Sequence, residues 1–154
     1  MLNNKTIGFI GAGNMAETLL SGLISSNQSK PENITCSDVR QTRLAELAKQ
    51  YGIKTTTDNK AVIGASEIIV YAVKPQIMAE VFKETADILD LSKLIISIAA
   101  GVPLAAIEAL VRKDLRLIRA MPNDYDWCFG GGLAQRLERM PEHRLASQGM
   151  QHLW

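Results

Sequence analysis

The 154-residue sequence contains little that could form a metal site or a disulfide. Its 2 cysteines, Cys36 and Cys128, lie far apart and without the short spacing that metal ligands share. His143 and His152 are the only imidazoles that could join them, so we expect no metal site. Two reduced thiols are the simpler interpretation, because disulfides are rare in reducing compartments.

Long apolar runs and an excess of charge of one sign are also missing. No run of about 18 apolar residues occurs, and the N-terminus lacks the charged and apolar segments of a secretory signal. The 17 basic residues are balanced by 16 acidic ones, so no net charge attracts nucleic acid or an anionic membrane. We therefore expect a cytoplasmic protein of one domain whose partners are small molecules or other subunits.

A glycine-rich segment stands near the N-terminus. Residues 5–16 read KTIGFIGAGNMA, which joins a short apolar stretch to Gly-x-Gly-x-x-Ala and then to a helical pattern. In a dinucleotide-binding fingerprint, Gly11 makes the tight turn, Gly13 admits a pyrophosphate and Ala16 permits close helix packing. Asp38 follows about twenty residues later, as the fingerprint requires. The pyrophosphate is expected on the helix N-terminus, and a glycine-rich turn that binds nothing is the alternative.

Strand and helix patterns alternate along the chain. The expected strands are Thr6 to Ile10, Ile34 to Ser37, Ile53 to Thr56, Glu67 to Val73, Leu94 to Ile98 and Leu115 to Ile118. Between them apolar residues recur at helical spacing, with Gly52, Asp58 and Pro103 at helix boundaries. The alternation predicts a Rossmann-type α/β fold, a doubly wound parallel sheet in the order 3-2-1-4-5-6 with an irregular or helical C-terminal tail. Loops at the carboxyl ends of its strands should converge on one crevice.

Four separate motifs add a resemblance to a known family. Residues 8–16, 72–76, 97–102 and 119–123 read GFIGAGNMA, AVKPQ, SIAAGV and RAMPN. In this order and at these separations they closely resemble the N-terminal half of pyrroline-5-carboxylate reductase. The resemblance covers about residues 4–123 and implies an NAD(P)-binding domain. It also implies an oxidoreductase of proline biosynthesis, which reduces the imine L-1-pyrroline-5-carboxylate to L-proline with hydride from NADPH or NADH.

The fingerprint, the resemblance and the charges after the second strand together imply a set of cofactor-binding residues. They are Gly11, Ala12, Gly13, Asn14, Met15, Ser37, Arg40, Asn59, Ala72, Val73, Lys74, Pro75 and Ala100. No catalytic side chain is assigned, because a protonated imine accepts hydride at carbon and needs mainly correct placement. Lys74 is expected to be a solvated lysine at a loop edge. Arg119 is expected either to bind a substrate carboxylate or to support its loop.

Charges after the second strand bear on cofactor preference. Asp38 could accept both ribose hydroxyls and repel a 2′-phosphate, which favours NAD. Arg40 and Arg43 could pair with that phosphate, which favours NADP. All three could also be exposed charges at a helix start. The resemblance favours NADP, in its reduced form NADPH, and NAD is the alternative.

The resemblance ends at Asn123. The family continues with a small-residue run, a further strand and a helical domain for substrate binding and dimerisation, whereas residues 124–154 carry no family motif. Codons for NDYDWCFGGG can be chosen so that a neighbouring frame reads TTTTGVSAGA, so we hypothesise a frameshifted or disordered tail. A short helical extension is the alternative, because Leu133, Leu137 and Met140 share a helix face. We expect a truncated chain that binds cofactor weakly, forms no family dimer and reduces no imine alone, or a non-catalytic dinucleotide-binding module.

Overall fold

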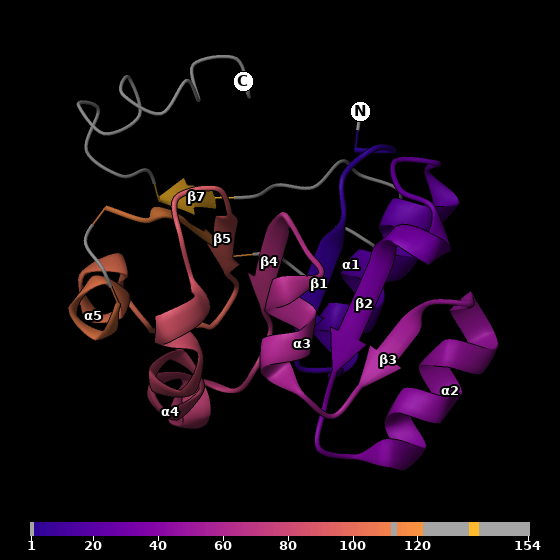
Figure 1. Cartoon of the computed structure of the whole chain (residues 1–154), viewed down its shortest axis with the longest axis horizontal. Coiled ribbons are helices and arrows are strands. Elements are labelled where there is room, and N and C mark those ends of the chain that lie inside the picture. Colours follow the sequence, from indigo (N-terminus) through magenta and orange to yellow (C-terminus); the bar gives the residue numbers. More distant parts are fainter. Residues whose placement is uncertain (1, 112–113, 122–135, 139–154) are drawn as a thin grey trace.

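The computed structural model describes residues 2–111, 114–121 and 136–138. Its strands are β1 (Ile7–Ile10), β2 (Ile34–Ser37), β3 (Lys54–Thr56), β4 (Ile68–Tyr71), β5 (Leu94–Ser97), β6 (Arg116–Met121) and β7 (Arg136–Glu138). Its helices are α1 (Asn14–Ser25), α2 (Gln41–Tyr51), α3 (Asn59–Gly64), α4 (Pro75–Thr85) and α5 (Leu104–Leu110). The strands form one sheet in the order β3-β2-β1-β4-β5-β6-β7 (Figure 1).

The sheet confirms the expected fold. Strands β1 to β6 pair in parallel in the order 3-2-1-4-5-6, and each is joined to the next through a helix. The right-handed crossovers usual for parallel strands place helices on both faces of such a sheet. The chain therefore has a Rossmann-type doubly wound α/β domain.

Alternate residues of each strand face opposite sides of the sheet. One buried cluster, which we call the α1–α2 core, joins the strands to helices α1 and α2; its members are Ile7, Phe9, Ala12, Ala16, Leu20, Ile34, Cys36, Leu44, Leu47, Ile53 and Val70. The other, the α3–α5 core, joins them to the remaining helices; its members are Ile10, Val62, Ile63, Ile69, Tyr71, Met78, Val81, Phe82, Leu89, Ile95, Ala99, Ile107, Leu115 and Leu117. The sheet is thus buried on both faces around β1 and β4.

Helix boundaries follow local chemistry. Helix α2 ends at Tyr51 and is followed by Gly52, whose φ of 72° is a left-handed conformation that glycine adopts at little cost. Helix α3 begins after Asp58, whose carboxylate accepts a hydrogen bond from the Lys60 N–H at 2.9 Å. Proline starts α4 at Pro75, whereas Pro103 is the residue just before α5.

The strand β7 corrects one alternative for the C-terminal region. It pairs antiparallel with β6, with Arg119 opposite Glu138 and Met121 opposite Arg136. Leu137 therefore belongs to a strand and not to the helix that its spacing suggested. The open edge of β6 offers unpaired backbone groups, and satisfying them outweighs the weak helical pattern. The frameshift hypothesis falls on residues 122–135 and 139–154, outside the described residues.

Candidate functional site

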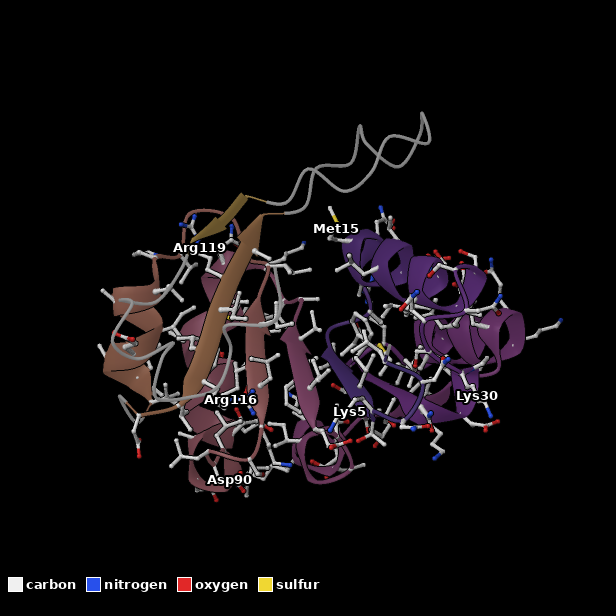
Figure 2. All side chains as sticks on the ribbon, turned by 90° about the horizontal axis from the view of Figure 1, so that it is seen from above. Lys5, Met15, Lys30, Asp90, Arg116 and Arg119 are labelled. Carbon is white, nitrogen blue, oxygen red and sulfur yellow. The ribbon has the colours of Figure 1, made fainter. Side chains whose placement is uncertain are left out.

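The predicted site residues gather where parallel strands end. In the sheet register, Ile10 lies beside Ser37 and Tyr71, and Ser97 lies beside Tyr71 and Arg119. The loops that follow β1, β2, β4 and β5 therefore start from one edge of the sheet, its carboxyl edge. Figure 2 shows Met15 and Arg119 at this edge and Lys5 and Arg116 at the opposite one.

Each predicted residue can be placed in these loops. Gly11, Ala12 and Gly13 join β1 to α1, and Asn14 and Met15 begin α1; Ser37 ends β2; Arg40 immediately precedes α2; Asn59 begins α3; Ala72, Val73, Lys74 and Pro75 lead from β4 into α4; and Ala100 follows β5. Their common location agrees with the expectation of a ligand site outside the carboxyl ends of the strands.

Gly11 occupies a position that only glycine fills without strain. Its φ is +102°, and a Cβ atom built there would lie 2.8 Å from the Ala72 carbonyl oxygen. The Gly11 N–H donates to the Ser37 carbonyl at 2.8 Å, and the Ala72 N–H donates to the Ile10 carbonyl at 2.8 Å. The turn after β1 is therefore wedged between the ends of β2 and β4.

Gly13 serves a different purpose. It precedes α1 with φ −74° and ψ −177°, an extended conformation open to any residue, and a Cβ atom there would meet nothing within 4 Å. Gly13 has no side chain that could cap α1. The first N–H groups of a helix have no partner within the helix itself. These donors and the helix dipole suit an anion, and a side chain at Gly13 would fill the approach to them. The residues present thus fit the pyrophosphate of a dinucleotide.

The carboxylate of Asp38 is fully engaged inside the protein. Oδ1 accepts from the backbone N–H and the Nε of Arg40, both at 2.9 Å. Oδ2 accepts from the Ala12 N–H at 2.9 Å and from Nη2 of Arg40 at 3.0 Å. A carboxylate has about four lone-pair sites, and all four are used. Asp38 is therefore a link between the glycine-rich loop and Arg40.

These contacts also set the ionisation of Asp38 and its neighbour. Burial opposes the charged form of Asp38, but the hydrogen bonds from Arg40 and Ala12 outweigh it and lower the pKa to about 2. Burial, with the Asp38 charge, raises the pKa of the Cys36 thiol to about 12. Cys36 is thus a neutral thiol, and its Sγ donates to the Gly11 carbonyl at 3.6 Å.

Arg43 is a further link from α2 to the glycine-rich loop. Its Nε donates to the Ala12 carbonyl at 2.8 Å, and Nη2 donates to Glu17 in the first turn of α1. Glu17 also accepts from the Tyr51 hydroxyl at 2.9 Å. The hydrogen bond from Arg43 is the main cause that lowers the pKa of Glu17, which holds it as a carboxylate.

Ser37 and Asn59 are brought together at the side of the same edge. The buried Ser37 hydroxyl donates to Oδ1 of Asn59 at 2.7 Å, and Nδ2 of Asn59 donates to Glu84 at 3.2 Å. This chain of hydrogen bonds ties the end of β2 to α3 and α4. The two predicted residues are therefore direct neighbours at this edge.

The remaining predicted residues differ in exposure. Val73 is half-buried, whereas Lys74, Pro75 and Ala100 are exposed. Arg119 is only 8% exposed, which agrees with support of its loop better than with a carboxylate ligand. Among the residues that the structure describes, no cluster of His, Cys, Asp or Glu could hold a metal. Nor, within those ranges, does any helix have the length and apolarity to cross a membrane.

Sequence reasoning missed two members of this network. Glu17 and Tyr51 give no motif signal: an acid in a first turn is ordinary, and an aromatic residue at a helix end usually packs in the core. Glu17 also lies 26 residues from Arg43, too far for any helical or strand periodicity. Only the assembled sheet brings α1 and α2 side by side.

Comparisons with known proteins agree with this arrangement. Residues 6–101 match the model of the family described as NADP oxidoreductase coenzyme F420-dependent. The pyrroline-5-carboxylate reductase of Methanosarcina acetivorans is 42% identical over 122 residues, which cover 79% of this chain and 45% of that protein. The structure of a pyrroline-5-carboxylate reductase from Coxiella burnetii has a TM-score of 0.75 at 37% identity, covering 79% of this chain and 45% of that one.

A second solved structure extends the likeness. Pyrroline carboxylate reductase of Plasmodium falciparum, solved with NADP bound, has a TM-score of 0.75 at 25% identity. The match covers 94% of this chain and 53% of that one. The chain therefore spans about half the length of the proteins it resembles, 45% in the Methanosarcina relative.

Proposed function

The chain belongs to the family described as NADP oxidoreductase coenzyme F420-dependent, and on that premise we propose that it is the dinucleotide-binding half of a pyrroline-5-carboxylate reductase. The reaction is the NAD(P)H-dependent reduction of L-1-pyrroline-5-carboxylate to L-proline, a step of proline biosynthesis. Its support is the 42% identity to the Methanosarcina reductase over 122 residues. The small-molecule substrate is thus a cyclic imine.

The observation that carries the dinucleotide part is the construction of the loop between β1 and α1. Gly11 turns the chain against Ala72, and Gly13 leaves the N–H groups at the start of α1 approachable. Asn14 and Met15, in the first turn, would contribute donors to the phosphates. The cofactor, when bound, supplies the hydride. The chain's own task is to hold and orient it, because placement alone lowers the barrier by up to about 7–11 kcal/mol.

The nicotinamide end would be held by main-chain segments. Val73 to Pro75 and Ala99 to Gly101 leave neighbouring strands, β4 and β5, at the carboxyl edge. Ala72 and Ala100 are small, so they let the backbone approach a ring closely. No side chain of these segments needs to act as a nucleophile, since a protonated imine already accepts hydride at carbon.

We propose NADPH as the preferred cofactor, with NADH as the alternative. Asp38 has its four acceptor sites filled by Ala12 and Arg40, so it is poorly suited to bind two ribose hydroxyls. The Arg40 side chain is 57% exposed beside it and can reach a 2′-phosphate, for which arginine offers paired donors. Ser37 and Asn59, tied to each other, would flank the adenine ribose.

We further propose that residues 4–123 form this half and that the substrate site needs more than the 154 residues. The chain covers only 45% of the Methanosarcina reductase, and a unit of four average helices needs on the order of 50 residues. The 154 residues alone are then expected to bind NADPH weakly, form no family dimer and leave the imine unreduced. Retained dinucleotide binding without catalysis is the second candidate function.

A cytoplasmic location fits this proposal. In the part of the chain that the structure describes, the one cysteine, Cys36, is a buried free thiol, as is usual for proteins of reducing compartments. The proposed cofactor and substrate are both small molecules of central metabolism, so neither nucleic acid nor a membrane is needed as a partner.

Calorimetric titration of the 154-residue chain with NADPH tests the proposal. We expect Gly13→Val to weaken binding at least about tenfold, because its side chain blocks the approach to α1. Gly64→Val is the matched control: Gly64 also has nothing within 4 Å of a built Cβ but ends α3. Equal NADPH affinity of wild type and Gly13→Val would contradict the site.

Activity is tested separately by following NADPH oxidation with pyrroline-5-carboxylate. The chain alone should give no measurable turnover. Turnover in the ordinary range of about 1–1000 per second would show that the 154 residues suffice for catalysis, and it would contradict the proposal that the substrate site needs more than these residues. Binding without turnover, unchanged by any added helical half of a reductase, favours the non-catalytic module.

A further inference from the structure

Two successive peptide units of the glycine-rich loop are held by side chains from outside the loop. The first unit, between Gly11 and Ala12, is fixed at both ends: its carbonyl accepts from Cys36 Sγ at 3.6 Å, and its N–H donates to Asp38 at 2.9 Å. The second unit, between Ala12 and Gly13, has its carbonyl fixed by Nε of Arg43 at 2.8 Å. Strand β2 and helix α2 thus set the orientation of two successive peptide planes.

The contact between Arg43 and the Ala12 carbonyl also fixes the direction of the Gly13 N–H, because the peptide unit between Ala12 and Gly13 is planar. In a trans peptide unit the C=O and N–H groups point in opposite directions. The described backbone has no cis peptide bonds, so holding the Ala12 carbonyl toward Arg43 directs the Gly13 N–H away from Arg43. That N–H stands at the start of α1, next to the donors of its first turn. The contact therefore aims one more donor into the anion site.

Each of the three nitrogens of the Arg43 guanidinium already faces a protein partner. Nε bonds Ala12, Nη2 bonds Glu17, and Nη1 lies 3.7 Å from Glu46. Its side chain is 19% exposed, against 57% for Arg40. A phosphate would have to compete with these partners for the part-buried Arg43. The more exposed Arg40 can approach a ligand while Asp38 keeps its hydrogen bonds from the backbone N–H groups of Ala12 and Arg40.

The pair with Glu17 adds an electrostatic contribution. Glu17 lies in the first turn of α1, so an unbalanced carboxylate there would repel a pyrophosphate at the helix N-terminus. The guanidinium of Arg43 compensates this charge at hydrogen-bond distance. The Tyr51 hydroxyl donates to the other carboxylate oxygen and holds Glu17 in place.

We infer that Arg43 is a positioning residue for the pyrophosphate loop and not a ligand of the 2′-phosphate. It orients the Ala12–Gly13 peptide and neutralises Glu17, and Arg40 is the residue that distinguishes NADPH from NADH. The inference rests on the proposed dinucleotide binding. Arg40 and Arg43, which lie three positions apart in the sequence, therefore have separate roles: Arg40 binds the 2′-phosphate, and Arg43 positions the loop.

Two fragments of the cofactor separate these roles. ADP-ribose carries the pyrophosphate without a 2′-phosphate. Adenosine 2′-monophosphate carries the 2′-phosphate without a pyrophosphate. Titration of the full chain should show that Arg43→Gln weakens ADP-ribose about tenfold, the loss typical of a charge-assisted hydrogen bond, with adenosine 2′-monophosphate unchanged. Arg40→Gln should do the opposite. A general loss of stability would weaken both fragments and would not produce this crossed pattern.

Matched variants test the geometry. Glu46→Gln removes an exposed partner of Arg43 that does not touch the loop, so both affinities should stay within about twofold. Arg43→Lys keeps the charge near Glu17, but one ammonium cannot reproduce the guanidinium fork, so ADP-ribose should still bind about tenfold more weakly. Wild-type affinity in Arg43→Lys would overturn the positioning role.

If Arg43→Gln weakens adenosine 2′-monophosphate, or changes neither fragment, the inference is wrong. If the wild type binds neither fragment, the proposed function itself fails. Should the Arg43 variants not fold, the NMR resonance of the Arg43 Nε–H is followed in the wild type during separate titrations with the two fragments. It should shift on addition of ADP-ribose and stay in place on addition of adenosine 2′-monophosphate. A shift on addition of adenosine 2′-monophosphate, or none on addition of ADP-ribose, overturns the inference.

Discussion

The two faces of the sheet reach the carboxyl edge with different chemistry. On the α1–α2 side, charged groups of Asp38, Arg40, Arg43 and Glu17 bind one another and the glycine-rich loop. On the α3–α5 side, β4 ends in a neutral aromatic residue: Tyr71 stacks on Phe82 with 3.9 Å between ring centroids, 17° from parallel.

This difference separates two tasks. Buried aromatic packing stabilises the fold over any ordinary range of pH and salt, because it involves no charge. A charged network fixes orientation and suits an anionic ligand, but the cost of removing its charges from water offsets part of its attraction, so it adds less stability than apolar burial. We therefore expect damage to the α3–α5 side to unfold the protein and damage to the α1–α2 side mainly to impair binding.

The largest expected effect is on the apolar side. Phe82→Ala removes a fully buried ring of the α3–α5 core and should lower the free energy of unfolding by about 3–5 kcal/mol. Urea denaturation measures it. Ile77→Ala, on the same helix but 45% exposed, should change it by less than about 0.5 kcal/mol. Similar losses in both variants would contradict the burial argument.

Gly11 joins the two sides, so its replacement should come next. Gly11→Ala combines a left-handed φ with a contact of 2.8 Å to the Ala72 carbonyl, and we expect a loss of about 2–3 kcal/mol. Gly101→Ala is the matched control, because Gly101 has a φ of +74° with open space around a built Cβ. The difference between the two isolates the contact with Ala72, and no difference would mean that the backbone yields there.

On the α1–α2 side, the free energy of unfolding should depend on pH through Asp38. The pKa of Asp38 falls from an ordinary value of 3.8 to about 2 in the folded protein. A depressed carboxyl pKa stabilises the fold above the unfolded value, and this contribution is lost as pH falls through the folded value. About 1–2 kcal/mol should therefore disappear between pH 4 and 2.

Comparison of the wild type with Asp38→Asn measures this effect. The difference in unfolding free energy between the two proteins should shrink as pH falls from about 4 to 2, in the window where Asp38 gains its proton. A constant difference across that range would show that the ionisation of Asp38 is not linked to folding.

The smallest expected effect is that of a single hydroxyl. The Tyr71 hydroxyl lies 2.8 Å from Oγ1 of Thr85, which itself donates to the Val81 carbonyl at 2.8 Å. Tyr71→Phe should cost about 1 kcal/mol, with the stacking on Phe82 retained. Burial raises the pKa of Tyr71, so the cost should not vary between pH 6 and pH 9. A pH-dependent loss in that range would assign Tyr71 to the charged side of the comparison.

Local patterns in the sequence were enough to predict the order of the elements and the location of the candidate site. Strand β2 begins and ends where the pattern predicted, at Ile34–Ser37. Apolar periodicity and glycine punctuation act over a few residues, so they can be read without the fold. The rule that ligands bind at the carboxyl ends of parallel strands then placed the loops at one edge.

The partners of the polar side chains at this edge could not be predicted from local patterns, because they depend on the assembled fold. Asp38 and Arg43 both bind Ala12, across separations of 26 and 31 residues, and Leu137 joins β6 as a strand. Such partners depend on which strands pair and how helices pack against them. Chain segments far apart in sequence then meet at hydrogen-bond distance, and the gain from satisfying buried polar groups selects the pairing.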